Sequence, residues 1–164
     1  MERKGREEII IDTDFLSSFF KIGKIDLIFK AFYIKEIFIC QAVMKELQEA
    51  RFYEDLLNFI RKNENKITIK SQLTKETKED FGEGEIESIY LAEQTNSLLL
   101  MDDRAAGRFA RTKGIAVLNI PEFLLYCKEK SVISLDEIKM IIQDLKEKDY
   151  YRFTEEVEDE LLKE

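Results

Sequence analysis

Short apolar runs, separated by amphipathic stretches, are the feature of this sequence that most restricts its fold. They stand at residues 9–11, 37–40, 67–69, 98–101 and 115–118. Isoleucine and leucine dominate these runs, without the polar alternation of a strand that has one solvated face, so each run is typical of a strand buried on both faces. Such strands, connected by helices, form a parallel sheet that helices cover on both sides. The sequence therefore predicts an α/β fold on a five-stranded parallel sheet.

The stretches between the runs have helical spacing. Helices are expected over Phe15–Ile22, Leu27–Phe32, Gln41–Arg61, Glu83–Gln94, Arg104–Thr112 and Pro121–Lys128. Ser134 and Glu137 have the spacing of a capping box at the start of a further helix, and a last acidic helix is expected over 154–162. The polar segment 72–79 is predicted to be the longest loop. We interpret residues 1–164 as one domain, with a core over about 8–130 and a C-terminal helical extension over about 132–164.

The composition excludes several kinds of chemistry. The 164 residues include no histidine, and imidazole is both the usual base of Ser-His and Cys-His catalysis and the commonest metal ligand. Cys40 and Cys127 are too far apart in the sequence for a zinc knuckle, so they are expected to be free buried thiols in a reducing compartment. Chemistry in this chain is therefore expected to use carboxylates.

Charge and hydropathy also restrict location and partners. A net charge of −8 argues against broad affinity for polyanions, although a local basic face could still hold nucleic acid. The first eight residues contain no apolar signal region, and no apolar stretch approaches the roughly 18 residues of a membrane span. We expect a cytoplasmic protein with no membrane partner. High lysine, glutamate and isoleucine content hints at a thermophile.

Acidic residues follow two of the predicted strands directly. Asp12 follows the first strand, and Asp102 and Asp103 follow the fourth. The C-terminal ends of the strands are where open parallel sheets bind ligands. Glu46 and Glu85 lie on the apolar faces of two predicted helices, so they too are expected to point toward the protein.

Four converging carboxylates need a counter-charge. Two unit charges about 4 Å apart repel by roughly 4 kcal/mol at an effective dielectric constant of 20. One alternative is that Arg104, Arg108 or Lys45 pairs with the acids, or that the acids stay solvated. The other is a divalent cation, and oxygen ligands without histidine or cysteine favour Mg²⁺ or Mn²⁺ over zinc. Spacing alone leaves both alternatives open.

Four segments in order resemble the PIN domain, the metal-dependent ribonuclease fold of VapC-type toxins, and within it a stand-alone prokaryotic PIN-like subgroup. These segments are 11–14, 43–47, 84–89 and 100–104. The separation of 18 residues between Glu85 and Asp103 is similar to that of the family's third and fourth acids. The tail over 132–162 also resembles that subgroup. Two departures are Gln41, where the group often has proline, and Glu85, where many toxins have aspartate.

The resemblance implies a sheet of order 3-2-1-4-5 and an acidic pocket in which Asp12, Glu46, Glu85 and Asp103 are the catalytic and metal-binding residues. It further implies Mg²⁺ or Mn²⁺ as cofactor and RNA as substrate. Asp12 and Asp103, at rigid strand ends, are the expected direct ligands. The two glutamates are expected to bind the metal through water or to support the direct ligands without touching the metal. Whether the protein is the toxin of a toxin-antitoxin pair, with an antitoxin protein as partner, stays open. Whether it forms a homodimer also stays open.

Three further residues are expected to support this pocket: Thr13, Asp102 and Glu87. The Thr13 hydroxyl could donate to a neighbouring carboxylate or to substrate, or only bond its own backbone. Because adjacent residues on a strand point to opposite sides, Asp102 and Asp103 are not expected to be equal ligands.

Basic residues that follow the fourth strand, and two tyrosines later in the chain, are candidates for RNA contact. Arg104, Arg108 and Arg111 share one face of a predicted helix and could bind phosphates, or could form an ordinary solvated face. Tyr150 and Tyr151 could stack on a base.

Two other hypotheses stay open. The first is a haloacid-dehalogenase-like phosphatase, because the acids after the first and fourth strands resemble that superfamily's first and last motifs. Leu16 stands where that family has threonine or valine, and Glu46 and Glu85 would have no role. The second is a non-catalytic interaction module, with an apolar surface for a homodimer or an antitoxin helix formed by Phe19, Phe20, Leu27 and Phe32.

Overall fold

The computed structural model describes residues 8–72, 74 and 80–164. Its strands form one parallel sheet in the order β3-β2-β1-β4-β5. They are β1 (Ile9–Ile11), β2 (Ile37–Cys40), β3 (Ile67–Lys70), β4 (Leu98–Leu100) and β5 (Val117–Leu118). This confirms the predicted α/β class and strand order, with boundaries within two residues of those expected. Most of the predicted loop over 72–79, and the N-terminal segment 1–7, lie outside the described residues.

The central strand explains why the first apolar run is uninterrupted. Ile9 is paired with Ile37 of β2 on one side and with Leu98 of β4 on the other. The three isoleucines of β1 are at most 2% exposed. Because β1 is covered on both faces and paired at both edges, no position in it tolerates a polar side chain.

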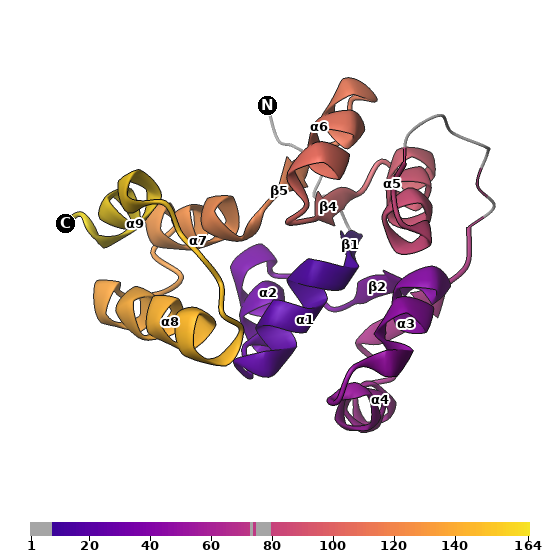
Figure 1. Ribbon diagram of the computed structural model, residues 1–164, viewed down its shortest axis with the longest axis horizontal. Helices are drawn as coiled ribbons and strands as arrows, with labels where there is room; N and C mark the ends of the chain where they lie inside the picture. The colour runs from indigo at the N-terminus through magenta and orange to yellow at the C-terminus, as the bar shows by residue number, and fades with distance from the viewer. Residues whose placement is uncertain (1–7, 73, 75–79) are drawn as a thin grey trace.

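Helices connect the strands and continue beyond the last one. They are α1 (Thr13–Lys21), α2 (Ile25–Phe32), α3 (Gln41–Glu46), the 3₁₀ turn η1 (Leu47–Glu49), α4 (Tyr53–Lys62), α5 (Glu83–Thr95), α6 (Arg104–Thr112), α7 (Ile120–Glu129), α8 (Leu135–Lys148) and α9 (Glu155–Leu162). Figure 1 shows α7, α8 and α9 grouped on one side of the molecule, away from α3 and α5. Buried side chains of α8 and α9, among them Leu145 and Leu161, belong to the same apolar cluster as the strands.

The single helix predicted over Gln41–Arg61 is wrong. The chain ends α3 at Glu46, passes through η1, becomes extended at Ala50 and restarts as α4 at Tyr53. Residues 47–52 contain neither proline nor glycine, so nothing local indicates this break. Tertiary packing overrides propensity here, because the turn places the ring of Phe52 5.6 Å from that of Phe20.

An aromatic cluster joins the first helix to the C-terminal helices. Phe15 and Phe19 of α1 stack at 4.9 Å, and Phe123 of α7 packs edge-on against them at 5.6 and 5.4 Å. All three are fully buried.

The four apolar side chains proposed as an interaction surface also lie against this core. Phe19 and Leu27 are buried, whereas Phe20 and Phe32 are half-buried and pack on other rings.

Both cysteines are free and buried, as expected. Burial raises the pKa of Cys40 and of Cys127 to about 12, so both are protonated thiols with no nucleophilic character at neutral pH. None of the helices in the described part of the chain is long and apolar enough to cross a membrane.

The aromatic cluster yields a stability prediction. We expect Phe123→Ala to lower the free energy of unfolding by about 3–5 kcal/mol, because it leaves a cavity against two buried rings. Met140→Ala is the matched control: Met140 lies on α8 but is 66% exposed, so its truncation should change stability by no more than about 0.5 kcal/mol. Urea unfolding measures both. Equal effects would show that the cluster is not what joins the C-terminal helices to α1.

Candidate functional site

The strand order brings Asp12 and Asp103 to the same edge of the sheet. Asp12 follows β1, and its amide donates to the Leu100 carbonyl of the neighbouring β4 at 2.9 Å. Asp103 follows β4 after two residues and caps α6. β2 lies on one side of β1 and β4 on the other, so the connections after β1 and after β4 run in opposite directions from the centre of the sheet. In open parallel sheets, a ligand-binding crevice forms at this position.

Glu46 joins three helices at this edge. Its Oε2 accepts a hydrogen bond from the Thr13 hydroxyl at 2.7 Å, and its Oε1 accepts one from the Gly84 amide at 2.7 Å. Thr13 begins α1 and Gly84 lies in the first turn of α5. A Cβ at position 84 would stand 2.7 Å from Oε2 of Glu46, so only glycine lets the carboxylate come this close.

Glu85 and Asp103 lie at the N-terminal ends of their helices, each with one oxygen bonded to the backbone. Glu85 Oε2 accepts from the Gly82 amide at 2.9 Å, and Asp103 Oδ1 accepts from the Ala106 amide at 2.8 Å. Their other oxygens accept no hydrogen bond from any residue that the structure describes. Helix N-termini stabilise negative charge, which holds both carboxylates at this edge.

Burial makes Asp12 the most perturbed acid of the group. Its side chain is 1% exposed, and its pKa is raised from 3.8 to about 8. The largest cause is the loss of water; the hydrogen bond from the Thr13 amide opposes this shift, and the neighbouring carboxylates of Glu85, Asp14 and Glu46 add to it. Ser88 donates to Asp12 Oδ1 at 3.2 Å. Loss of solvent, and then the charges of Asp103, Asp14 and Glu46, likewise raise the pKa of Glu85.

Asp14 belongs to this group, although the sequence analysis did not select it as a site residue. Partial loss of water raises its pKa, as do the carboxylates of Asp103 and Glu46, even though its side chain stays accessible. The signal available in the sequence was its position two residues after Asp12, in the first turn of α1.

No lysine or arginine forms an ion pair with these carboxylates in the described part of the chain; the charge of Lys21, which pairs with Asp149, lowers the pKa of Asp14 by less than each neighbouring acid raises it. No lysine or arginine nitrogen there lies within 4.0 Å of Asp12, Asp14, Glu46, Glu85 or Asp103. Lys45 pairs instead with the exposed Glu83 at 3.7 Å. The alternative in which Arg104, Arg108 or Lys45 forms ion pairs with the acids is therefore wrong for the described residues.

The donor set suits a hard divalent cation. All of its donors are carboxylate or hydroxyl oxygens, which Mg²⁺ and Mn²⁺ prefer. Among the described residues, no three acidic or thiol side chains are gathered tightly enough to hold an ion by themselves. A cation at this edge would therefore take at most two of these carboxylates as direct ligands, and water would complete its coordination.

Asp102 points away from the acidic group. Its Oδ1 accepts from the Ile120 amide at 2.9 Å and from the Tyr151 hydroxyl at 2.9 Å. Burial raises the pKa of Asp102, and these two bonds oppose that shift. The residue thus fixes the start of α7 and the segment after α8. This placement agrees with the expectation that Asp102 and Asp103 are not equivalent.

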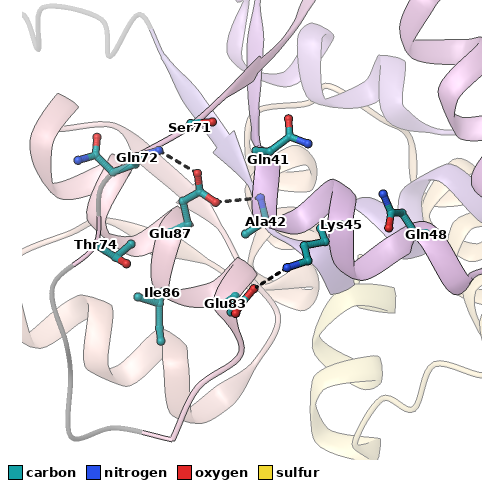
Figure 2. Close-up of a pocket in the computed structure, with 10 residues that line it drawn as sticks. All are labelled: Gln41, Ala42, Lys45, Gln48, Ser71, Gln72, Thr74, Glu83, Ile86 and Glu87. Carbon is teal, nitrogen blue, oxygen red and sulfur yellow. Dashed lines mark hydrogen bonds and ion pairs between the residues drawn. The ribbon is translucent and has the colours of Figure 1, made fainter.

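Glu87 positions α3 instead of joining the acids. Figure 2 shows its carboxylate between the Ala42 amide and the Gln72 amide, each donating at 2.8 Å. Its side chain is 8% exposed and faces a different hollow, of about 550 Å³, between α3 and α5. By holding the first turn of α3, Glu87 fixes the helix that carries Glu46.

The three arginines predicted to contact RNA line one hollow of about 300 Å³ beside Asp103. Arg111 bonds Glu122 at 2.8 Å and the Val117 carbonyl at 3.1 Å. Tyr151 lines the same hollow, whereas Tyr150 is 85% exposed and does not line it.

Comparison with known proteins gives a family match and two similar structures. The family model DUF3368, described as a PIN domain, matches residues 8–164. A PilT N-terminus domain protein from the hyperthermophilic archaeon Sulfolobus solfataricus aligns with a TM-score of 0.52 and 16% identity over 72% of this chain and 91% of its own. A domain of a functionally unknown protein from Methanocaldococcus jannaschii aligns with a TM-score of 0.49 and 24% identity over 70% and 91%. No curated protein matches.

The burial of Asp12 predicts a pH dependence of stability. Because its pKa is higher in the folded protein than the usual 3.8, the folded state binds more protons, and its contribution to stability falls between about pH 4 and pH 8. The slope is at most about 1.4 kcal/mol per pH unit. In EDTA, Asp12→Asn should therefore gain stability relative to wild type as the pH rises through this range. Urea unfolding at several pH values measures this difference, and a constant difference would contradict the raised pKa.

The close approach of Gly84 to the Glu46 carboxylate predicts that a methyl group at position 84 will displace this carboxylate. We expect Gly84→Ala to displace the Glu46 carboxylate, remove its two hydrogen bonds and weaken Mn²⁺ binding about tenfold. Gly107→Ala, also within a helix, is the control, because its Cβ would meet only Val117 Cγ1 at 3.9 Å. Calorimetric titration with Mn²⁺ compares them. Unchanged affinity in Gly84→Ala would remove Glu46 from the metal site.

Proposed function

The chain belongs to the PIN domain family, which is typically a nuclease fold, and from this premise we propose that it is a metal-dependent endoribonuclease. It hydrolyses phosphodiester bonds of RNA with Mg²⁺ or Mn²⁺ bound at the acidic edge of the sheet.

The observation that carries this proposal is the group of five carboxylates without a cation partner among the described residues. A buried, unpaired carboxylate costs several kcal/mol unless it takes up a proton or a cation. Asp12 has a pKa of about 8 without metal, and a bound divalent ion would displace its proton.

Each residue has a distinct part in this mechanism. A cation at this edge would be held directly by Asp12 and Asp103, on rigid strand ends, and through water by Glu85. Glu46, which Thr13 and Gly84 orient, would support the same site. A divalent ion held there would lower the pKa of a bound water and neutralise charge on the attacked phosphate. Asp14, whose side chain is exposed, is placed to accept a proton from the attacking water.

The two other hypotheses have less support. In a haloacid-dehalogenase-like phosphatase, Glu46 and Glu85 would have no role, yet both lie beside Asp12. Asp102 would be the first acid of that superfamily's last motif, but its carboxylate already accepts hydrogen bonds from the Ile120 amide and the Tyr151 hydroxyl. A non-catalytic module would retain the destabilising burial of Asp12 without any gain.

Thermal unfolding with and without Mn²⁺, followed by RNA cleavage, tests the proposal. With Mn²⁺ at about 100 times its dissociation constant, the free energy of unfolding of the wild-type protein should rise by about 2.7 kcal/mol. Asp103→Asn should gain little and should cleave single-stranded RNA at least about a hundredfold more slowly. Asp159→Asn, which changes an exposed acid on α9, should behave as wild type.

Two outcomes would contradict the proposal. One is a wild-type protein that Mn²⁺ does not stabilise and that leaves RNA intact. The other is rapid turnover of para-nitrophenyl phosphate with a phosphorylated Asp12, which would favour the phosphatase.

A further inference from the structure

The arginine hollow, of about 300 Å³, lies between α6 and the chain that joins α8 to α9. One wall carries Arg104, Gly107, Arg108 and Arg111 of α6, and the other carries Tyr151, Arg152 and Phe153. Asp102 and Asp103 lie between the two walls. The hollow therefore adjoins the acidic edge of the sheet, and its second wall comes from the C-terminal extension.

Three guanidinium groups of this hollow have no acidic partner in the structure as described. Arg104, Arg108 and Arg152 are exposed, and no carboxylate oxygen of a described residue lies within 4.0 Å of them. Arg111, by contrast, is held by Glu122. In a chain with 34 acids and 26 basic residues, three neighbouring arginines without ion pairs form a local site for an anion. The planar guanidinium fork matches the oxygens of a phosphate.

Two aromatic rings pack against each other on the second wall of the hollow. Tyr151 and Phe153 lie with ring centroids 4.8 Å apart and an interplanar angle of 58°. Both are half-buried, and the Tyr151 hydroxyl is fixed by Asp102 at 2.9 Å. Aromatic rings held in place beside arginines are the usual surface on which unpaired RNA bases stack.

We propose that the arginine hollow binds the nucleotide next to the cleaved bond of single-stranded RNA, with its phosphate on Arg104, Arg108 and Arg152 and its base against Tyr151 and Phe153. This inference rests on the proposed ribonuclease function and adds a substrate subsite to it. The hollow shares Asp103 with the acidic edge, so one strand occupies both. The C-terminal extension, by supplying Arg152 and the two rings, then takes part in substrate binding.

Binding without cleavage tests the subsite. The probe is a fluorescein-labelled single-stranded oligoribonucleotide of about ten nucleotides, followed by anisotropy in EDTA over about 50–200 mM salt. Arg108→Gln and Arg152→Gln should each weaken binding about three- to tenfold. Their double variant should reduce the slope of log affinity against log salt by up to about 0.7, since these arginines share one phosphate and each phosphate contact on a single strand contributes about 0.7. Phe153→Leu should weaken binding with an unchanged slope.

Arg61→Gln is the matched control, because Arg61 is an exposed arginine on α4 and does not line the hollow. It should bind RNA within about twofold of wild type. The melting temperature of each variant, measured in the same buffer, shows whether it is folded. Because none of the arginines replaced is buried, we expect all of them to remain folded.

The outcomes separate this inference from the proposed function. If wild type cleaves RNA but Arg108→Gln and Arg152→Gln bind the probe as wild type does, the subsite is wrong and the function stands. If both variants lose affinity but wild type with Mn²⁺ cleaves no RNA, the subsite stands as an RNA site and the nuclease function is wrong. Displacement of the probe by an acidic peptide as effectively as by unlabelled RNA would overturn the inference in favour of a protein partner.

Discussion

The carboxylate of Asp12 lies at the end of the central strand, 1% exposed and beyond 4.0 Å of any cation in the described residues. Removing an ionised carboxylate from water in this way costs more free energy than a single hydrogen bond from Ser88 returns. The side chain is therefore protonated near neutral pH until a cation arrives. The rest of the site follows from this constraint, because every neighbouring acid adds to the same unfavourable charge.

Acids at this edge of the sheet have two different physical roles. Glu87 and Asp102 satisfy backbone amides, at Ala42 and Ile120 respectively, and so hold the first turns of α3 and α7. Glu85 and Asp103 also accept one amide each but keep a second oxygen without a partner among the described residues. Glu87 lies two residues after Glu85, and Asp102 is next to Asp103, so the sequence does not distinguish the two roles. The role of each acid depends on the side of its helix or strand from which the side chain projects.

Much of the fold could be predicted because the inner strands β1 and β2 are buried on both faces, which leaves continuous apolar runs such as Ile9–Ile11. Asp12 and Asp103 could be selected because strand ends are identifiable from sequence. The break after Glu46 could not, since it depends on packing of Phe52 against a distant ring. Arg152 was missed for the same reason: it reaches the site only through the path of the chain after α8, which no local pattern specifies.

Unpaired acids and unpaired arginines lie side by side here without neutralising one another. Asp103 accepts with one oxygen from the amide of Ala106, whereas Arg104 and Arg108 line the hollow that residues 151–153 also line, with no carboxylate oxygen of a described residue within 4.0 Å of them. Each set then needs a partner from solution, a cation for the acids and an anion for the arginines. In the proposed complex, the cation and the arginines would act on one polyanion, because the hollow that the arginines line also includes Asp103. A phosphate chain together with a divalent cation would satisfy both sets at once, which neither a metal ion alone nor an acidic peptide alone would do.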